Sequence, residues 1–542
     1  MPQIYWNLIF SQSLVPYLSK KKDSGMIINI FGAKCIGIDA VRVTVEVDIS
    51  FGLGIHLVGL ADVAVKESLL RTMTALQTMN FKIPGKKIVI NLAPADMHKK
   101  GSGFDLPIAL GIIAASAQVD LIDLDKYIIM GELGLDAVVR SVPGALPFAE
   151  LAVREGFKGC ILPYESAMEA REYEGTTIYG VHTLADVLRI LSGKDDVSDL
   201  LVCNQPLPEP DSEPGYANDY MDFSEIIGQE AARRGLEIAA AGGHNVIMIG
   251  TPGSGKSSLA KAMAGILPPM SKEEAILTSK IYSVAGKGNT RFGLMNKRPF
   301  RSPHYSASLA AIVGGGGGDN ILPGEVSLAQ SGILFLDEFA QMPKSVTEAL
   351  RSPLEDRKVT ISRLRSKVEY PASFMLVAAT NPCPCGYWGE GDRCTCTPGQ
   401  RIGYLSRLSG PIMDRIDVQL WLKAVEPGKL VHQAEAESSD AVRRRVTAAR
   451  EIQKERFSCE GIFTNAEMNN RQMKRFCPLS FDCKELLEKI IRGMGLSARA
   501  FSRVVKMART IADLEGLRDI EPRHLSEAAG YRFLDRLNGM KQ

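Results

Sequence analysis

The stretch that decides the fold is NVIMIGTPGSGKSSLAKAMAGIL, residues 245–267. Its first residues, 245–249, form an apolar run that predicts a buried strand, and a helical pattern follows the glycines. Between them lies a match to G-x-x-x-x-G-K-[ST], a pattern in which backbone N–H groups and a helix N-terminus surround phosphate groups. The predicted nucleotide-binding residues are Gly250, Thr251, Pro252, Gly253, Ser254, Gly255, Lys256 and Ser257.

Two acidic residues extend this prediction to a metal ion and to catalysis. In a loop of this kind Lys256 reaches the β- and γ-phosphates of ATP, and the hydroxyl of Ser257 binds Mg²⁺. Downstream, the apolar run 333–336 predicts a second buried strand, which ends at Asp337 and Glu338. We expect Asp337 to hold the Mg²⁺ ion through water and Glu338 to polarise the attacking water molecule.

A third apolar run, residues 374–380, ends at Asn381. We expect this asparagine to lie between the two earlier strand ends, where its amide could orient water or the γ-phosphate. The sequence therefore predicts an α/β fold with a nucleotide site at the ends of its strands.

Composition narrows the class of protein. The chain has 542 residues, of which 45% are hydrophobic and 23% charged, as in ordinary folded proteins of about three domains. The net charge of +2 excludes a global basic field, so any contact with nucleic acid must come from a local patch. No apolar run is long enough to span a bilayer, and most of the ten cysteines are scattered. These features predict a cytoplasmic protein without a membrane partner.

Strand-like and helix-like patterns divide the chain into five parts. The expected division is an extension that we interpret as disordered, residues 1–25; an α+β domain, 26–200; a proline-rich linker, 201–221; a second α/β domain, 222–425; and a charged helical lid, 426–542.

The three strand ends resemble those of the AAA+ ATPases, and longer segments narrow this resemblance. Residues 226–245, 298–339 and 408–419 are similar to the magnesium-chelatase-like branch, specifically the ComM/YifB family. The similarity covers nearly everything from Met26 onward. It implies a P-loop AAA+ core with helices on both faces of a parallel sheet, an α+β Lon-protease-like N-terminal domain and a small C-terminal helical lid.

The resemblance also implies roles for two arginines. Arg415, in MDRID, corresponds to the arginine finger that acts on ATP bound by the neighbouring subunit, so a ring, expected to be a hexamer, is implied. Arg499, in SARAFSR, corresponds to a second sensor on the lid, although Arg503 lies one helical turn away and could substitute. For Arg415 the alternative is a surface arginine in a salt bridge.

Two segments are candidates for insertions that face the pore of such a ring. The first holds the glycine run 314–318, and the second is an alternating pair of short strands within 355–374, with Arg363 and Arg365 near its turn. The branch is similar to the minichromosome-maintenance helicases in carrying two such insertions. Cations there would follow the phosphates of one DNA strand. The alternative is a solvated charged hairpin.

Four cysteines stand close together in ATNPCPCGYWGEGDRCTC, residues 379–396. The spacing C-x-C-x8-C-x-C of Cys383, Cys385, Cys394 and Cys396 favours a structural Zn²⁺ site, although C-x-C is tighter than the usual spacing. Free thiols and a redox-active pair are the alternatives. A zinc site here would brace the chain that leads from Asn381 onward.

The front domain shows how the resemblance to Lon-type proteases breaks down. Gly103 occupies the position of the nucleophile, and no lysine stands near SVPGALPFAE, residues 141–150, where the base belongs. We therefore expect no peptidase activity, although Ser102 is adjacent. Four lysines of this domain are interpreted mainly as solvent-exposed, with DNA contact as the alternative: Lys86, Lys87, Lys99 and Lys100.

The function that these observations imply is an ATP-driven ring motor on DNA. On the resemblance, it is a helicase that promotes branch migration during recombination of incoming DNA in natural transformation. Its expected cofactors are ATP, Mg²⁺ and a structural Zn²⁺, and its expected partners are single-stranded or branched DNA, further copies of itself and recombination proteins. The alternatives are a chelatase-type subunit, against which the front domain argues, and a protein unfoldase or protease.

Overall fold

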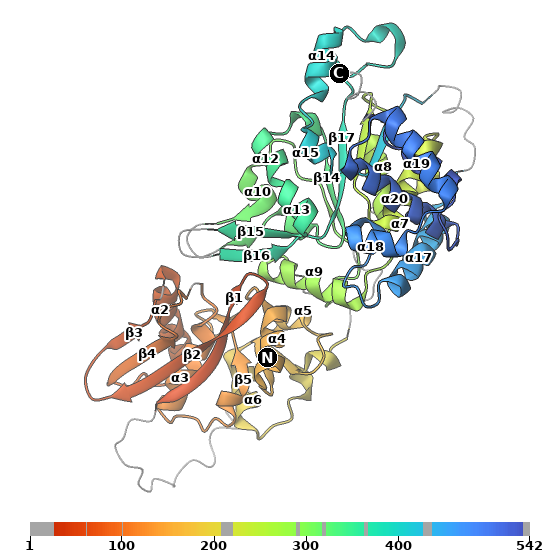
Figure 1. Cartoon of the computed structure of the whole chain (residues 1–542). Coiled ribbons are helices and arrows are strands. Elements are labelled where there is room, and N and C mark those ends of the chain that lie inside the picture. The colour runs from red at the N-terminus through yellow and green to blue at the C-terminus, as the bar shows by residue number, and fades with distance from the viewer. Residues whose placement is uncertain are drawn as a thin grey trace.

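The computed structural model describes residues 27–60, 62–99, 101–206, 220–288, 293–316, 321–362, 367–425 and 436–534. Figure 1 shows an N-terminal lobe, drawn in red to yellow, and a larger lobe that holds the nucleotide-binding loop, with helix α9 (Lys272–Val284) between them. The expected extension, residues 1–25, lies outside the described residues. So do residues 207–219 of the expected linker.

The N-terminal lobe is built on a mixed sheet. Its strands run in the order β3-β4-β2-β1-β5-β8-β9, with antiparallel pairing of β1, β2 and β4 and parallel pairing elsewhere. Alternate residues of β2 are buried, because successive side chains of a strand point to opposite faces. The strands are β1 (Ile28–Ile36), β2 (Asp39–Ser50), β3 (Ile55–Val58), β4 (Lys87–Ala93), β5 (Tyr127–Ile129), β8 (Gly159–Pro163) and β9 (Thr177–Val181), with a small pair of β6 (Glu132–Leu133) and β7 (Val139–Arg140).

Helices complete the α+β character of this lobe. Helix α3 is apolar on nearly all sides and almost entirely buried, as expected of a helix enclosed by its neighbours. Helix α6 begins with a capping box at Thr183. The helices are α2 (Val63–Thr78), α3 (Asp105–Ala115), α4 (Ala145–Glu155), α5 (Tyr164–Glu169) and α6 (Leu184–Ser192).

The position of the Lon-type nucleophile is enclosed by apolar side chains. A Cβ atom at Gly103 would lie 3.0 Å from Met130 Cε and 3.3 Å from Val142 Cγ1, so the two sequence segments compared with the protease do meet in space. The hydroxyl of Ser102 donates to the carboxylate of Glu132. A valine therefore lies beside the position where a protease would carry its nucleophile.

One of the four lysines expected to be exposed is buried. The side chain of Lys99 is 0% exposed, its ammonium donates to the carbonyl of Pro94, and its backbone N–H donates to Leu60 O. Burial lowers the pKa of Lys99. The sequence pattern gave no sign of this, because the neighbours that enclose Lys99 come from other elements. Lys100 lies outside the described residues.

The larger lobe contains the predicted parallel sheet. Within the described residues its order is β11-β14-β17-β10-β18, and every adjacent pair is parallel. All residues of β10, β14 and β17 are buried, as expected where helices cover both faces of a sheet. The strands are β11 (Phe300–Arg301), β14 (Ile333–Leu336), β17 (Met375–Thr380), β10 (Val246–Gly250) and β18 (Val418–Leu422).

The helices of this lobe come from the segments before and between the strands of its sheet. They are α7 (Glu230–Gly242), α8 (Lys256–Gly265), α9, α10 (Leu309–Val313), α11 (Glu325–Leu328), α12 (Lys344–Ala349), α13 (Arg351–Asp356), α14 (Pro398–Leu405) and α15 (Gly410–Met413). Figure 1 places α14 at the end of this lobe that is farthest from the N-terminal lobe.

The first core strand begins one residue later than the expected range of 245–249. The backbone N–H of Asn245 donates to the carboxylate of Asp417 at 2.9 Å instead of to a neighbouring strand. Its side chain links the adjacent segments, because the amide nitrogen donates to Arg415 O at 2.9 Å and the amide oxygen accepts from the backbone N–H of Leu376 at 2.9 Å.

Both expected insertions contain antiparallel strand pairs. The first pairs β12 (Gly314–Gly315) with β13 (Leu322–Pro323), and the second pairs β15 (Lys358–Ser362) with β16 (Lys367–Pro371). Figure 1 shows the second pair extending from the larger lobe on the side of α9. Arg363 and Arg365 belong to the connection between β15 and β16, which lies outside the described residues.

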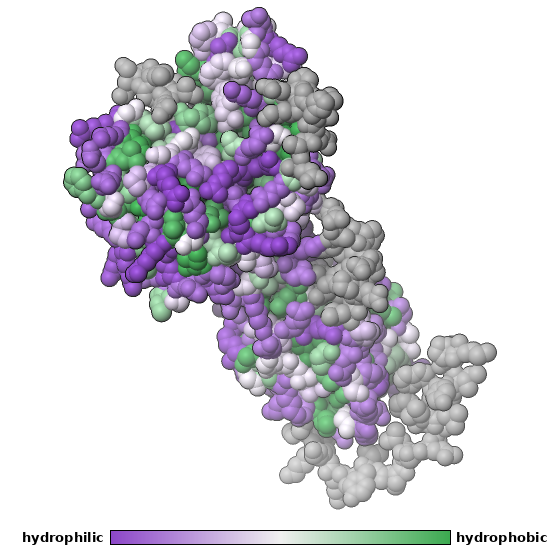
Figure 2. Space-filling view, turned by 90° about the vertical axis from the view of Figure 1, so that its right-hand side faces the viewer, coloured by the Kyte–Doolittle hydropathy of each residue, from purple (hydrophilic) through white to green (hydrophobic). Residues whose placement is uncertain are grey.

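The C-terminal part is helical, as predicted, and it covers one side of the core. Its helices are α17 (Ser439–Arg456), α18 (Asn470–Phe476), α19 (Phe481–Met494), α20 (Ala498–Leu514) and α21 (Pro522–Gly530). Seen from this side, the surface is mostly hydrophilic (Figure 2). Among the described residues, no helix is both long and apolar enough to cross a bilayer.

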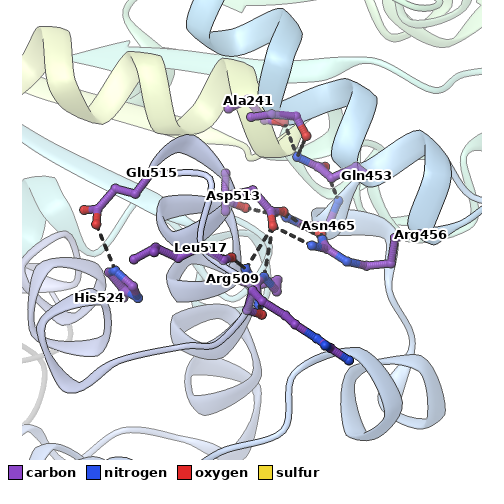
Figure 3. Close-up of polar contacts among 12 residues, drawn as sticks. Ala241, Gln453, Arg456, Asn465, Arg509, Asp513, Glu515, Leu517 and His524 are labelled. Atoms are coloured by element: carbon purple, nitrogen blue, oxygen red, sulfur yellow. Dashed lines mark hydrogen bonds and ion pairs between the residues drawn. The ribbon is translucent and has the colours of Figure 1, made fainter.

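A buried polar network joins the lid helices (Figure 3). The carboxylate of Asp513 accepts hydrogen bonds from Arg509, Arg456 and Asn465 at 2.7–3.1 Å. Gln453 extends the network to the core by donating to Ala241 O at 2.9 Å. Because each buried charge has a partner, the cost of desolvation is offset and the lid is fixed to helix α7.

Helix α9 forms one part of the contact between the two lobes, and Ile38, which packs against the core of the larger lobe, forms another. Ser283 donates to the carboxylate of Glu169 at 2.7 Å, and its carbonyl accepts from the backbone N–H of Gly144 at 3.2 Å. Lys280 forms ion pairs with Asp39 at 3.1 Å and with Glu150 at 2.6 Å. The N-terminal lobe is thus held to the larger lobe by a buried hydrogen bond to Glu169 and by ion pairs of the buried Lys280 with more exposed carboxylates.

This contact leads to a prediction about pH. Burial raises the pKa of Glu169 to about 7, above its value in the unfolded chain, so folding favours the protonated carboxyl. The resulting stability is present below the ordinary glutamate pKa and is lost as the pH rises through about 7. We expect thermal stability to fall between about pH 5 and pH 8, and less so in Glu169→Gln, when both are measured by scanning fluorimetry. Parallel curves for the two proteins would contradict this.

Candidate nucleotide-binding site

The order of the strands brings the predicted residues to one edge of the sheet. Strand β17 lies between β14 and β10, so Asn381 follows the strand between the one that leads to Asp337 and the one that leads into the loop. This is the placement expected of Asn381 from the sequence. Ligands of open parallel sheets bind at this carboxyl edge.

Lys256 is the centre of the site. Its ammonium donates to Gly250 O at 2.7 Å, to Thr251 O at 2.9 Å and to Asn381 Oδ1 at 3.3 Å. Burial lowers the pKa of Lys256, while the charge of Asp337 acts in the opposite direction. The three acceptors hold the positive charge over the loop, at the N-terminus of α8, where phosphate oxygens are favoured.

Ser257 and Asp337 form a pair of oxygen donors. The hydroxyl of Ser257 donates to Asp337 Oδ2 at 3.1 Å, and the backbone N–H of Glu338 donates to Asp337 Oδ1 at 2.8 Å. A hydroxyl and a carboxylate beside a phosphate-binding loop are the donors that suit Mg²⁺, so the residues present fit this ion. Glu338 adopts a left-handed conformation with φ of 50°, a strained backbone of the kind concentrated at functional sites.

Glycines allow the loop to turn tightly. Gly253 and Gly255 have φ angles of 78° and 87°, a region that other residues rarely adopt. At Gly250, a Cβ atom would lie 2.6 Å from Ser254 Oγ and 2.9 Å from Leu422 O, so only glycine fits without displacing its neighbours.

Models of three magnesium-chelatase domains match successive parts of the chain. The magnesium chelatase subunit ChlI matches residues 222–430, the C-terminal domain of that subunit matches 436–532, and a model described as subunit ChlI of Mg-chelatase matches 45–166.

Similarity to individual proteins extends over most of the chain. Protein YifB of Salmonella typhimurium is 43% identical over 504 residues, which are 93% of this chain and 96% of that protein. Competence protein ComM of Haemophilus influenzae is 41% identical over 514 residues, 94% of this chain and 98% of ComM. The chain belongs to the ComM/YifB family of magnesium-chelatase-like AAA+ ATPases. Lon protease 2 of Bacillus subtilis is 30% identical over 125 residues, 23% of this chain and 22% of that protease.

The front domain is less specific to ComM/YifB proteins than expected from the sequence. A family model named after the ChlI subunit of magnesium chelatase matches residues 45–166, which belong to this domain. The presence of this domain alone therefore does not distinguish the two classes of activity.

In this ComM/YifB family ATPase, the expected arginine finger is engaged within its own protomer. The side chain of Arg415 is 10% exposed, and its guanidinium forms an ion pair with Glu355. It also donates to Arg351 O at 3.1 Å and to Pro411 O at 2.7 Å. To act on a neighbouring subunit, Arg415 would have to leave these partners, so its role as a finger stays a prediction.

The two lid arginines differ in their surroundings. Arg499, whose side chain is 62% exposed, lies 3.4 Å from Asp414 Oδ2. Arg503 donates hydrogen bonds to Asp414 O at 2.6 Å and to the buried carboxylate of Asp417. Burial acts to raise the pKa of Asp417, but the charge of Arg503 and the contact with His244 outweigh it and hold that pKa well below its usual range. To serve as the sensor in place of Arg499, Arg503 would have to leave these partners, so the assignment of Arg499 stays a prediction.

The four cysteines predicted to bind zinc converge. Their sulfur atoms all lie within 4.8 Å of one another. Three of the separations are 3.3 Å for Cys383 and Cys385, 3.8 Å for Cys383 and Cys394, and 3.7 Å for Cys385 and Cys394. The fourth cysteine, Cys396, completes the group. The thiol donor set is that of a structural zinc site.

Two residues of the site were not singled out from the sequence. Gln229, with φ of 59°, donates from its amide to Ser254 O at 3.2 Å and to Lys423 O at 2.7 Å, and so ties the segment before α7 to the loop. Glu390 accepts a hydrogen bond from the hydroxyl of Thr251 at 2.6 Å. Neither contact has a local sequence signal, because each joins residues that are distant along the chain.

Proposed function

We propose that this ATPase is a ring-forming motor that moves DNA, and that it promotes branch migration during the uptake and recombination of DNA. The proposal of an ATP-driven motor is supported mainly by one observation. Lys256, Asn381 and the Ser257–Asp337 pair lie together at one edge of the sheet. The DNA substrate is supported by full-length similarity to a protein named for competence.

Each residue has a part in this proposal. Lys256 binds the phosphates, while Glu338 polarises the attacking water and Asn381 orients it. Ser257 and Asp337 would hold Mg²⁺, which supplies neutralisation of phosphate charge when bound. Arg415 acts across the subunit boundary of a homohexamer, and Arg499 reports the nucleotide to the lid. The four cysteines hold Zn²⁺.

The β15–β16 hairpin is the proposed DNA-contacting element. Its strands pair regularly from Lys358 with Pro371 to Ser362 with Lys367. Arg363 and Arg365 follow Ser362 closely in the sequence. Cations at such positions suit a phosphate backbone and bind without sequence preference.

Changing Arg363→Ala together with Arg365→Ala is expected to abolish DNA strand displacement while leaving ATP hydrolysis without DNA unchanged. Both charges lie outside the nucleotide site in sequence, and their loss removes phosphate contacts. Displacement of a labelled strand from forked DNA measures the effect. The matched control is Lys358→Ala, which removes an exposed lysine at the base of the same hairpin. Normal displacement by the double variant would rule out the hairpin as the DNA contact.

A chelatase-type or protein-remodelling motor is the second candidate, favoured by the descriptions of the matched domain models. The two functions predict different activators. A DNA motor should hydrolyse ATP faster with single-stranded or branched DNA, whereas a remodelling motor should respond to a protein partner. Comparing ATPase rates with forked DNA and with an unfolded protein separates them.

A further inference from the structure

The sulfur atoms of the four-cysteine loop, residues 383–396, lie close enough together to ligate one metal ion. Sulfur ligands about 2.3 Å from a zinc ion lie about 3.8 Å from each other, close to the separations of Cys394 from Cys383 and from Cys385. A disulfide would need a sulfur–sulfur distance of about 2.0 Å, well below the 3.3 Å of the nearest pair.

The backbone turns sharply after the first cysteine pair. The backbone N–H of Gly386 donates to the carbonyl oxygen of Cys383 at 3.0 Å. Gly386 has a φ of 89°, a conformation that other residues rarely adopt. Glycine at this position therefore allows the chain to turn back toward the second cysteine pair.

The same loop is seated on the nucleotide-binding loop. The carboxylate of Glu390 accepts from Thr251 Oγ1 at 2.6 Å. A Cβ atom at Gly386 would lie 3.0 Å from Pro252 Cδ, so the backbone of Gly386 lies close against the ring of Pro252. The cysteine loop thus contacts two consecutive residues of the phosphate-binding loop.

Aromatic packing fixes the other side of the loop to the sheet. The ring of Trp388 packs edge-on against Trp421, with 5.5 Å between centroids, and Trp421 packs against Phe533 at 5.8 Å. Trp421 belongs to β18 and pairs with Ile249, the residue before the start of the nucleotide-binding loop. The cysteine loop therefore contacts the nucleotide-binding loop, the neighbouring strand β18 and, through Trp421, the C-terminal segment.

Glu390 lies in the short segment between the two cysteine pairs. It is flanked by Gly389 and Gly391, whose φ angles of 100° and 56° favour glycine. On one side the segment is held by the packing of Trp388 on Trp421 and by a hydrogen bond from the backbone N–H of Glu390 to Tyr387 O at 3.1 Å. A metal ion shared by Cys385 and Cys394 would join the two ends of the segment and so restrict the position of the Glu390 carboxylate further.

We propose that Cys383, Cys385, Cys394 and Cys396 bind one Zn²⁺ ion, and that this ion positions Glu390 against Thr251 and thereby sets the affinity of the loop for nucleotide. Glu390 is a positioning residue, since it acts through Thr251 and Pro252. The proposal rests on the ATPase site but not on DNA as the substrate, because its readouts are metal content and nucleotide binding.

The first test measures metal in the full chain, purified reduced and without chelator. Elemental analysis should find about one zinc per chain, as expected for a single four-thiolate site. Cys394→Ser combined with Cys396→Ser should lose the metal. The matched control, Cys203→Ser with Cys459→Ser, changes two exposed cysteines outside the cluster and should keep it. Zinc-free wild-type protein would overturn the proposal.

The second test uses Glu390→Ala, which leaves the four cysteines in place. We expect it to keep its zinc and its melting temperature while binding a fluorescent ADP analogue about fivefold to tenfold more weakly, the scale of one typical intramolecular hydrogen bond. Thr251→Val added to Glu390→Ala should weaken binding no further, because the two residues act as a pair.

Removing zinc from the wild-type protein with a chelator completes the test. Binding should weaken to a similar extent as in Glu390→Ala, and tryptophan emission should change, because Trp388 and Trp421 are two of the three tryptophans in the chain. Nucleotide affinity that stays the same or tightens, in Glu390→Ala or in the zinc-depleted protein, would overturn the positioning role. A failure of DNA strand displacement would leave these readouts unaffected.

Discussion

Replacing Lys256 with alanine is expected to abolish ATP hydrolysis. The ammonium is the positive group that lies over the loop, and its contact with Asn381 connects the loop to the neighbouring strand end. Removing one preorganised donor of this kind typically costs a factor of about 10²–10³ in turnover, and the loss of phosphate binding adds to it. Phosphate release and binding of a fluorescent ATP analogue measure the two effects.

The same helix offers a matched control. Lys261 is exposed on α8, and Lys261→Ala removes a positive charge close in sequence without touching the loop. We expect its ATPase rate to remain that of the wild type. Hydrolysis by Lys256→Ala at a rate near wild type would show that the ATPase activity does not depend on this loop.

The second large effect is expected from Arg415→Ala, with ATP turnover falling about 10³-fold or more if the guanidinium acts across a subunit boundary. In the protomer Arg415 also forms an ion pair with Glu355, so the variant could act by loosening α13 instead. Glu355→Ala separates the two explanations. It removes the ion pair but keeps the arginine, and we expect it to retain turnover.

Mixing experiments test the shared site directly. If Arg415 serves the neighbouring protomer, adding Arg415→Ala chains to wild-type chains should depress the activity of the mixture below the sum of its parts. Activity proportional to the wild-type fraction would place the finger within one chain. A drop in melting temperature for Arg415→Ala that accounts for the entire loss of activity would instead show that Arg415 acts through stability and not as a finger.

Local patterns in the chain were enough to predict the core of the site. The nucleotide-binding loop consists of consecutive residues whose glycines define its shape, so the motif carries its own geometry. The ends of β14 and β17 could be placed from apolar runs, because buried parallel strands bring their carboxyl ends together. Asn381 is the clearest case, since its expected place between the other strand ends agrees with the strand order.

Contacts between distant segments could not be predicted in this way. The hydrogen bond between Thr251 and Glu390 joins residues 139 positions apart, and that between Ser283 and Glu169 joins residues 114 positions apart. The burial of Lys99 belongs to the same class, because its charged side chain gives no sign of the elements that enclose it.

The sequence by itself determined the α/β class, the phosphate-binding loop, the acidic strand end and the grouping of four cysteines. Each of these features depends on residues that are close together along the chain. Only the tertiary structure decided which of these parts touch. It placed the cysteine loop on the nucleotide-binding loop and Arg415 on Glu355, since the order of strands in a sheet, and not the order of residues in the chain, sets these distances.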